Sequence, residues 1–531
     1  FSTRTASQIV QEHFDPGENG TPGGPLFGVQ FSQLPCSDLA NRFSAGTGAG
    51  PHRSPLGLSA DPGGFPLYRN GVLIGGVGVA ADDTYGLDPD INDRDHNLDE
   101  LIAWAGTYGY SAPADRRADH IAVNGLSLRY SDIGFSDLAR DPAAAPAFAT
   151  LTAGTGGLIA VPGYYAGTAI LAGTVFGQTA SGIRADAADY PGLDAFVLDD
   201  GSGSNRYPPR AGTDGAGALT AAEVKTLVQQ ALMVANRARA QIRQPLGSQA
   251  RVTVSVVDTN GVALAVARTR DAPLFGTDVS LQKARTAMFN SGAYAAADLQ
   301  GAAAAKYLTD TIDFSAGTAK LSTLALSPLS DYLTRLRGFL GLPNALGDGA
   351  VAFTDRAGGN LSRPFYPDGI DGNPPGPLSH PYAQWSPFQD GLQLDLVYNT
   401  VALHLAFYLQ QLGLSVTLDG TPLPPLADVP QNCTGIARLP NGTQIFPGSV
   451  PIYRGNQLVG GIGVSGDGVD QDDMVAFLGL ANAGAVLGSI NNAPPAMRAD
   501  RLAPQGAQLR YVECPQAPFL DYSTQDVCGG Q

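Results

Sequence analysis

The spacing of apolar residues from about residue 218 onwards predicts a helix followed by a strand. Thr220 and Glu223 have the spacing of a capping box, in which each side chain bonds a free backbone N–H at a helix start. Apolar residues then recur every three or four positions until Pro245, which predicts the end of the helix. In the segment Val252–Val256 valines alternate with polar residues, a pattern typical of a half-buried strand.

The same region continues with a tight turn and a second helix. Asp258–Gly261 reads Asp-Thr-Asn-Gly, and such residues are favoured in the turns between antiparallel strands. Val262–Arg268 is the predicted returning strand. We expect Thr277 or Asp278 to cap a second helix that ends at about Met288.

A second hairpin and another helix follow much later. The sequence PIYR precedes the turn Gly455–Asn456, QLVGGIGVSG follows it, and a short acidic helix is predicted from about Val469. Gly461 and Gly463 match part of a dinucleotide-binding pattern, but a hairpin turn precedes them, so we interpret them as small residues that let a helix pack closely on the strand. The order helix, hairpin, helix, hairpin, helix predicts an α+β fold with helices flanking an antiparallel sheet.

Three segments of the chain occur twice in the same order, which indicates a duplicated domain. The matching pairs are Phe1–Pro25 with Phe353–Pro377, Pro66–Val79 with Pro451–Val464, and Arg117–Tyr130 with Arg498–Tyr511. The elements predicted between Ala218 and Ala352 have no counterpart before Phe1. We therefore expect the first copy to be incomplete and to hold only the second half of the fold.

The repeats divide the chain into three predicted regions. Residues 1–132 form the incomplete first copy, and residues 133–217 form a connector that contains strands. Residues 218–521 form the second copy, which a large insertion at about 292–432 interrupts.

The charge of the chain argues against some classes of partner. There are 48 acidic and 32 basic residues, which gives a formal net charge of −16. A nucleic-acid partner is excluded, because no basic patch is available to neutralise phosphates. No signal peptide is visible, and no apolar run is long enough to predict a membrane span.

The four cysteines are candidates for disulfides. Cys36, Cys433, Cys514 and Cys528 form no CxxC motif, so a zinc site is not indicated. We interpret them as two disulfides of an exported protein, periplasmic or extracellular, with free buried thiols as the alternative. Three pairings are possible, and the sequence leaves all three open.

Several separated segments resemble the GlcG/HbpS family, also called the haem-degrading domain family. They are LTAAEVKTLVQQAL, the hairpin and helix from VTVSVVDTNG to LQKARTA, and FPGSVPIYRGNQLVGGIGVSGDGVDQDDMVAF. The resemblance implies a small sheet with packed helices and assembly into symmetric oligomers. It also implies binding of haem or of corrinoid-pathway ligands, and several members of the family have no proven enzymatic activity.

A haem site needs an axial donor beside an apolar slot. None of the six histidines is shared between the two copies, so no family ligand can be transferred to this chain. His380 lies beside Tyr382 in SHPYAQW and is the better exposed candidate. His404 lies in the apolar segment LVYNTVALHLAFYL, where a core position is the main alternative to a ligand.

Acidic loops are candidates for a calcium site. Asp88, Asp90, Asn92, Asp95 and Asp99 lie within a short acidic stretch whose start resembles an EF-hand, although the glycine that such a loop needs is missing. A solvated acidic loop is the alternative. Two further candidates, Asp368 and Asp371, lie in a loop repeated between the copies, where turn formation alone also explains them.

These observations give three hypotheses for function. The first is an exported, non-enzymatic protein that binds haem or a related tetrapyrrole. The second is a cell-surface structural or assembly protein, stabilised by calcium. The third is an enzyme acting on a small metabolite, although no known catalytic motif is present. The expected partner is a second copy of the chain or the missing N-terminal half of its own precursor.

Overall fold

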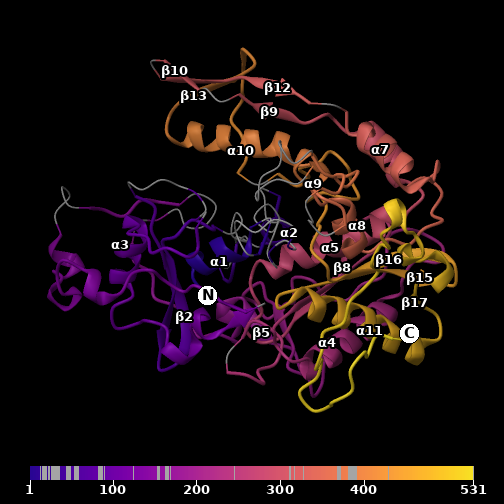
Figure 1. Cartoon of the computed structure of the whole chain (residues 1–531), viewed down its shortest axis with the longest axis horizontal. Helices are drawn as coiled ribbons and strands as arrows, with labels where there is room; N and C mark the ends of the chain where they lie inside the picture. Colours follow the sequence, from indigo (N-terminus) through magenta and orange to yellow (C-terminus); the bar gives the residue numbers. More distant parts are fainter. Residues whose placement is uncertain are drawn as a thin grey trace.

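The structure is a computed structural model. It describes the whole chain apart from residues 12, 15–20, 22–23, 25–35, 44–48, 53–58, 82–85, 87, 89, 124, 152–155, 162–166, 168, 244, 310–311, 316, 327, 368–371, 381–390, 429 and 530–531. In Figure 1 the N-terminal elements lie at one end of the molecule, and the elements around the C-terminus lie at the other.

A seven-stranded antiparallel sheet forms the centre of the second copy. Its strand order is β17–β15–β16–β7–β8–β6–β5, so two strands from the predicted connector pair at one edge. The strands are β5 (Ile183–Ala185), β6 (Phe196–Leu198), β7 (Thr253–Val257), β8 (Ala263–Arg268), β15 (Ser449–Arg454), β16 (Gln457–Ser465) and β17 (Asn491–Asn492). The predicted turns at residues 258–261 and 455–456 connect β7 to β8 and β15 to β16.

Helices cover both faces of this sheet. Helices α4 (Ala221–Arg237) and α11 (Val469–Leu487) share one apolar core with the sheet, and α5 (Gly276–Asn290) belongs to the core on the other face. Strand β7 is consequently buried on both faces, so the predicted half-buried strand is wrong: its polar Ser255 hydroxyl is paired with that of Ser280 at 2.6 Å. The fold is the expected α+β arrangement.

Two predicted helix boundaries differ from the structure. Helix α4 begins at the predicted capping box but ends at Arg237, before Pro245, because the next residue, Ala238, forms an isolated bridge with Phe519. Helix α5 begins at Gly276, so Asp278 lies inside its first turn and does not cap it. The Asp278 carboxylate accepts hydrogen bonds from Ser37 and Leu39 instead.

The first copy repeats the end of this architecture. Its elements are α1 (Thr3–Ile9), β1 (Gly64–Arg69), β2 (Val72–Gly78), α3 (Leu98–Gly106), β3 (Ala122–Val123) and β4 (Leu126–Ser127). The β1–β2 hairpin has the same register and the same bulge as β15–β16. The caps also match: Ser2 donates to the Tyr130 carbonyl, and Thr354 donates to the Tyr511 carbonyl.

The insertion lies between α5 and β15; its strands and α10 lie across the top of Figure 1, while residues of α6 and α7 share an apolar core with α5. Its β10, β11, β13 and β14 make a four-stranded sheet, and β9 pairs with β12. The elements are α6 (Ala295–Gly301), β9 (Lys306–Leu308), β10 (Asp313–Ser315), β11 (Thr318–Leu321), β12 (Thr323–Ala325), α7 (Ser330–Leu340), α8 (Asp355–Leu361), α9 (Gly391–Asp395), α10 (Tyr398–Gln411), β13 (Ser415–Leu418) and β14 (Thr421–Pro422). Of these, α8 belongs to the repeat and matches α1.

Two disulfides are present, of which one joins residues 397 positions apart and the other closes a short loop with a separation of 14. Cys36, just before α2 (Asp38–Asn41), is bonded to Cys433, and Cys514 is bonded to Cys528. The prediction of two disulfides is confirmed, and disulfides fit a secreted protein. None of the helices in the described part of the chain combines the length and apolar character of a membrane span.

Candidate functional site

His380 lies in a small polar cluster of the insertion. Its Nε2 is 3.3 Å from Asp395 Oδ1 and 3.3 Å from the Tyr332 hydroxyl, and the ring is partly buried. Tyr332 and Tyr307 both donate their hydroxyl protons to the buried Asp395 carboxylate, at 2.7 and 2.8 Å. Burial and the neighbouring carboxylate raise the pKa of both tyrosines, so they stay protonated donors. Tyr382 lies outside the described residues.

This cluster gives His380 the surroundings of a metal-binding histidine. A ligating histidine usually donates its second ring N–H to a carboxylate, which fixes the tautomer and the direction of the ring. Asp395 is placed to do this for His380 through Nε2, which leaves Nδ1 as the nitrogen that could bind iron. The residues present therefore fit one axial donor of a haem.

His404 is less suited to hold a ligand. It lies in α10, and its Nδ1 is 3.2 Å from the Asp428 carbonyl oxygen. The ring lies against Phe407 and Tyr408, with centroid separations of 6.1 and 4.8 Å. These aromatic contacts favour the core position over a ligand role.

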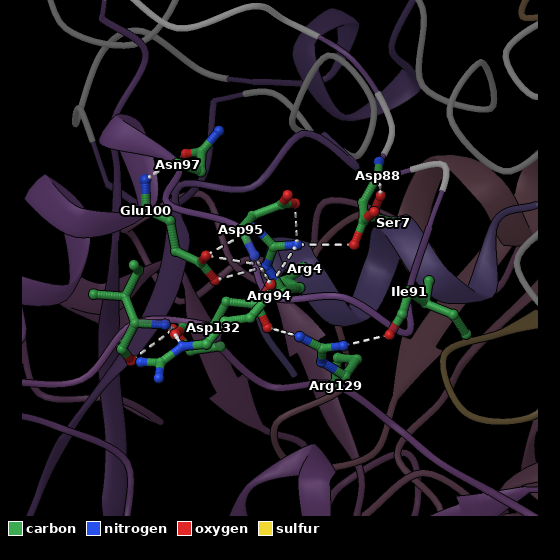
Figure 2. A network of polar contacts seen from close by, with 12 residues as sticks. Arg4, Ser7, Asp88, Ile91, Arg94, Asp95, Asn97, Glu100, Arg129 and Asp132 are labelled. Atoms are coloured by element: carbon green, nitrogen blue, oxygen red, sulfur yellow. Dashed lines mark hydrogen bonds and ion pairs between the residues drawn. The ribbon is translucent and has the colours of Figure 1, made fainter. Parts of the chain in front are cut away.

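The acidic loop of the first copy surrounds an arginine. Figure 2 shows the guanidinium of Arg4, from α1, among four carboxylates from different parts of the copy. Ion-pair distances from Arg4 are 2.8 Å to Asp88, 3.0 Å to Asp95, 2.9 Å to Glu100 and 3.1 Å to Asp132. The arginine thus provides a positive charge where the sequence suggested a metal ion.

The other calcium candidates lie in different surroundings. Asp90 and Asn92 make local contacts along the loop, in which the amide N–H of each bonds the carboxylate two residues earlier. Asp99 lies in the first turn of α3 and is buried. Asp88, Asp93 and Asp95 bring carboxylate oxygens within 4.8 Å of one another. The candidate calcium ligands therefore include Asp93, which is not among the ligands predicted from the sequence, and do not include Asp99. Asp368 and Asp371 lie outside the described residues.

The second copy contains an equivalent arginine centre. Arg356 of α8 forms ion pairs of 2.6 Å with both Asp470 and Glu513, and it also bonds Asp473. The repeat aligns Arg356 with Arg4, but sequence reasoning did not identify the carboxylates. The aligned blocks held that signal, because Glu513 follows Tyr511 by two residues as Asp132 follows Tyr130.

A buried lysine lies close to this centre. Lys283, in the middle of α5, is 2% exposed, and its Nζ donates to Asp472 Oδ2 at 2.8 Å and to the Val464 carbonyl at 2.9 Å. Burial raises the pKa of Asp472 to about 6, and it also raises the pKa of Asp473 to about 6. The Lys283–Asp472 ion pair joins α5 to α11, and the Arg356–Asp473 ion pair joins α8 to the same helix.

An open cavity of about 760 Å³ lies beside these ion pairs. The Arg498 guanidinium is 5.3 Å from the ring centres of both Phe477 and Tyr511 at its wall. The described lining contains no histidine, and four carboxylates would repel the propionates of a haem. The lining residues are Asp470, Phe477, Arg498, Asp500, Tyr511, Val512, Glu513, Cys514, Pro515, Gln516, Asp526, Cys528 and Gly529.

Comparison with known families matches the second copy. A family model described as haem degrading protein HbpS-like matches residues 228–321 and 417–481. The first segment runs from α4 to β11, and the second from β13 into α11, so the matched parts contain the central hairpins and α5. The chain contains an HbpS-like domain. No curated protein and no solved structure matched the chain.

The HbpS-like domain supports a haem-related function at the level of the family. The match leaves the ligand residues open, because His380 lies in the part of the insertion between the two matched segments. The candidate haem donor therefore lies outside the matched segments, and the structure adds the position of its ring beside Asp395.

Proposed function

We propose that this protein binds haem or a related tetrapyrrole, with His380 as an axial donor. The observation that carries the proposal is the hydrogen-bonded group of Tyr332, Asp395 and His380, which orients the imidazole. The HbpS-like domain supports the choice of ligand. When bound, haem supplies a redox-active iron. The chain's own residues hold the donor nitrogen in place and fix which nitrogen carries the proton.

We expect His380→Ala to abolish a hemin-induced Soret shift. The substitution removes the donor nitrogen but leaves the hydrogen bonds from Tyr307 and Tyr332 to Asp395. Asp395→Asn should weaken hemin affinity by about 10–100-fold, because the carboxylate that accepts the second ring N–H of His380 and orients the ring is lost. Titration with hemin, followed by absorbance, measures both effects.

The matched control is His120→Ala. His120 is exposed on the first copy and lies 4.0 Å from Asp119, far in sequence from the insertion. This variant should bind hemin as the parent chain does. The proposal is overturned if the parent protein leaves the hemin spectrum unchanged, or if His380→Ala and His120→Ala bind hemin equally.

Calcium binding by the acidic loop is a second proposal, favoured by the grouping of Asp88, Asp93 and Asp95. We expect calorimetry after chelation to show one weak site, which Asp93→Asn removes while the contacts of Arg4 remain. Asp119→Asn, on the exposed surface of the same copy, should change nothing. If the parent protein gives no heat, Arg4 is the only cation that the loop needs.

We also propose that the protein is exported to the periplasm or the extracellular space. The support is the pair of disulfides, which persist in oxidising compartments and are rare in the cytosol.

A further inference from the structure

In the second copy, strand β16 is covered on its edge and on one face. Its edge pairs with β7 from Gly461 to Ser465, and its face lies against α5. A Cβ atom added at Gly461 would lie 2.2 Å from the Ala284 carbonyl oxygen, and one added at Gly463 would lie 2.1 Å from that of Ser280. These glycines are needed because the helix backbone lies directly on the strand.

In the first copy, the matching strand β2 has the same glycine pattern, but no helix equivalent to α5 lies on these glycines in the described part of the chain. Gly76 and Gly78 align with the two glycines of β16, yet a Cβ at Gly78 would meet no described atom within 4 Å. Val72, Leu73 and Ile74 are 63%, 57% and 50% exposed. Among the described strands, β2 pairs with β1 alone. An exposed apolar edge strand is a template for pairing with another chain.

The buried carboxylate of Asp99 indicates the chemistry of a partner at this site. Asp99 matches Asp472, because added Cβ atoms at Gly63 and Gly448 would lie 3.0 and 2.8 Å from the respective Cβ atoms. Asp472 receives a hydrogen bond from Lys283 of α5. Asp99 is 3% exposed, and its Oδ1 has no hydrogen-bond partner in the described part of the chain. Burying a carboxylate without a partner is costly, so this position favours an incoming cation.

We propose that β2 and Asp99 form a docking site for a half-domain of the same fold, with the strand and helix that β7 and α5 provide in the second copy. The partner supplies a strand that pairs with the β2 edge, as β7 pairs with β16. It also supplies a helix with small residues that lie on Gly76 and Gly78, and with a lysine that pairs with Asp99. The second copy shows each of these contacts in the same relative place.

The partner is not a second copy of this chain in its folded form. The only helix of this type in the described residues is α5, which is buried along Gly276–Phe289 inside its own domain. A second chain could offer it only by opening that domain. The site therefore takes a separate half-domain whose strand and helix are not already in use. This inference does not depend on haem binding.

Residues 218–291, which comprise α4, β7, β8 and α5, provide a probe for the test. We expect this fragment to fold on the full chain, with a gain of helical circular dichroism on mixing, and to slow hydrogen–deuterium exchange of residues 72–78 by about tenfold or more. Lys283→Met in the fragment should weaken binding by at least about tenfold, since it removes one partner of a buried charge pair. A fusion of the fragment to Phe1 through a Gly/Ser linker repeats the measurement at high effective concentration.

Gly78→Leu in the full chain blocks the site without disturbing the free fold, because its Cβ meets open space. This variant should keep the parent's melting temperature and lose the protection of residues 72–78. Gly173→Leu, also in open space, is the matched control and should keep the protection. Unchanged exchange of residues 72–78 in both the mixture and the fusion overturns the proposal. So does concentration-dependent protection of these residues without any fragment, which would mean that a second copy covers the site.

Discussion

Replacing Arg356 with methionine is expected to lower the free energy of unfolding by about 3–5 kcal/mol, the cost of leaving the buried Asp473 carboxylate without its cation. Arg356 touches Asp470, Asp473 and Glu513, which come from α11 and from the segment that follows it. Methionine fills a similar volume, so the loss reflects charge rather than an empty space. Chemical denaturation followed by circular dichroism measures the change, and hydrogen exchange locates it at α8 and α11.

Two variants make this result specific. Arg356→Lys keeps the charge but loses the planar fork that reaches several carboxylates, so it should fall between the parent and Arg356→Met. Arg510→Met removes an exposed arginine that pairs with the same Glu513 at 2.5 Å, and it should cost no more than about 1 kcal/mol. Equal losses of unfolding free energy for Arg510→Met and Arg356→Met would show that the ion pairs of Arg356 stabilise the fold no more than the exposed ion pair of Arg510.

Lys283→Met is expected to be comparably damaging, at about 3–5 kcal/mol near pH 7, because the Asp472 carboxylate would stay buried without its ammonium partner. Replacing both residues, as in Lys283→Met with Asp472→Leu, should restore most of the stability. The double variant removes both charges and leaves no unpaired group. A double variant as unstable as the single one would assign the loss to packing instead.

The pH dependence of this pair follows from the raised pKa of Asp472. Its pKa is about 6 in the folded protein against an ordinary value of 3.8, so the folded state binds the proton more tightly. This group therefore makes the protein less stable as pH rises from about 4 to about 6, and has no further effect above that. Without Lys283 the pKa of Asp472 should rise further. The deficit of Lys283→Met should consequently shrink at pH 4 compared with pH 8, as denaturation at the two values would show.

The sequence predicted those parts of the fold that local patterns determine. The hairpin turns, the start of α4 and the beginning of α11 near Val469 were all readable from short segments. The close packing expected at Gly461 and Gly463 is confirmed by the carbonyl oxygens of α5 next to them. Alignment of the repeat also matches Arg4 with Arg356, although the aligned segments alone do not show that each arginine is surrounded by carboxylates.

Features that depend on distant segments could not be read in this way. Thr253 and Ser255 suggested an exposed face, but α5 covers it and supplies a hydroxyl partner for Ser255. Asp278 looked like a helix cap, yet its partners Ser37 and Leu39 lie about 240 positions earlier in the chain. The pairing of His380 with Asp395 likewise depends on how the insertion folds, since no local pattern brings the two side chains together.

The bond between Cys36 and Cys433 closes a covalent ring across a sequence separation of 397 residues. A single cut anywhere inside that ring leaves the two pieces of the chain joined as one molecule. Exposed loops are where proteases cut first, and the whole connector and the whole insertion lie within the ring. A nicked protein would therefore keep its full mass, and its two copies would stay tethered, until a reductant opened the ring.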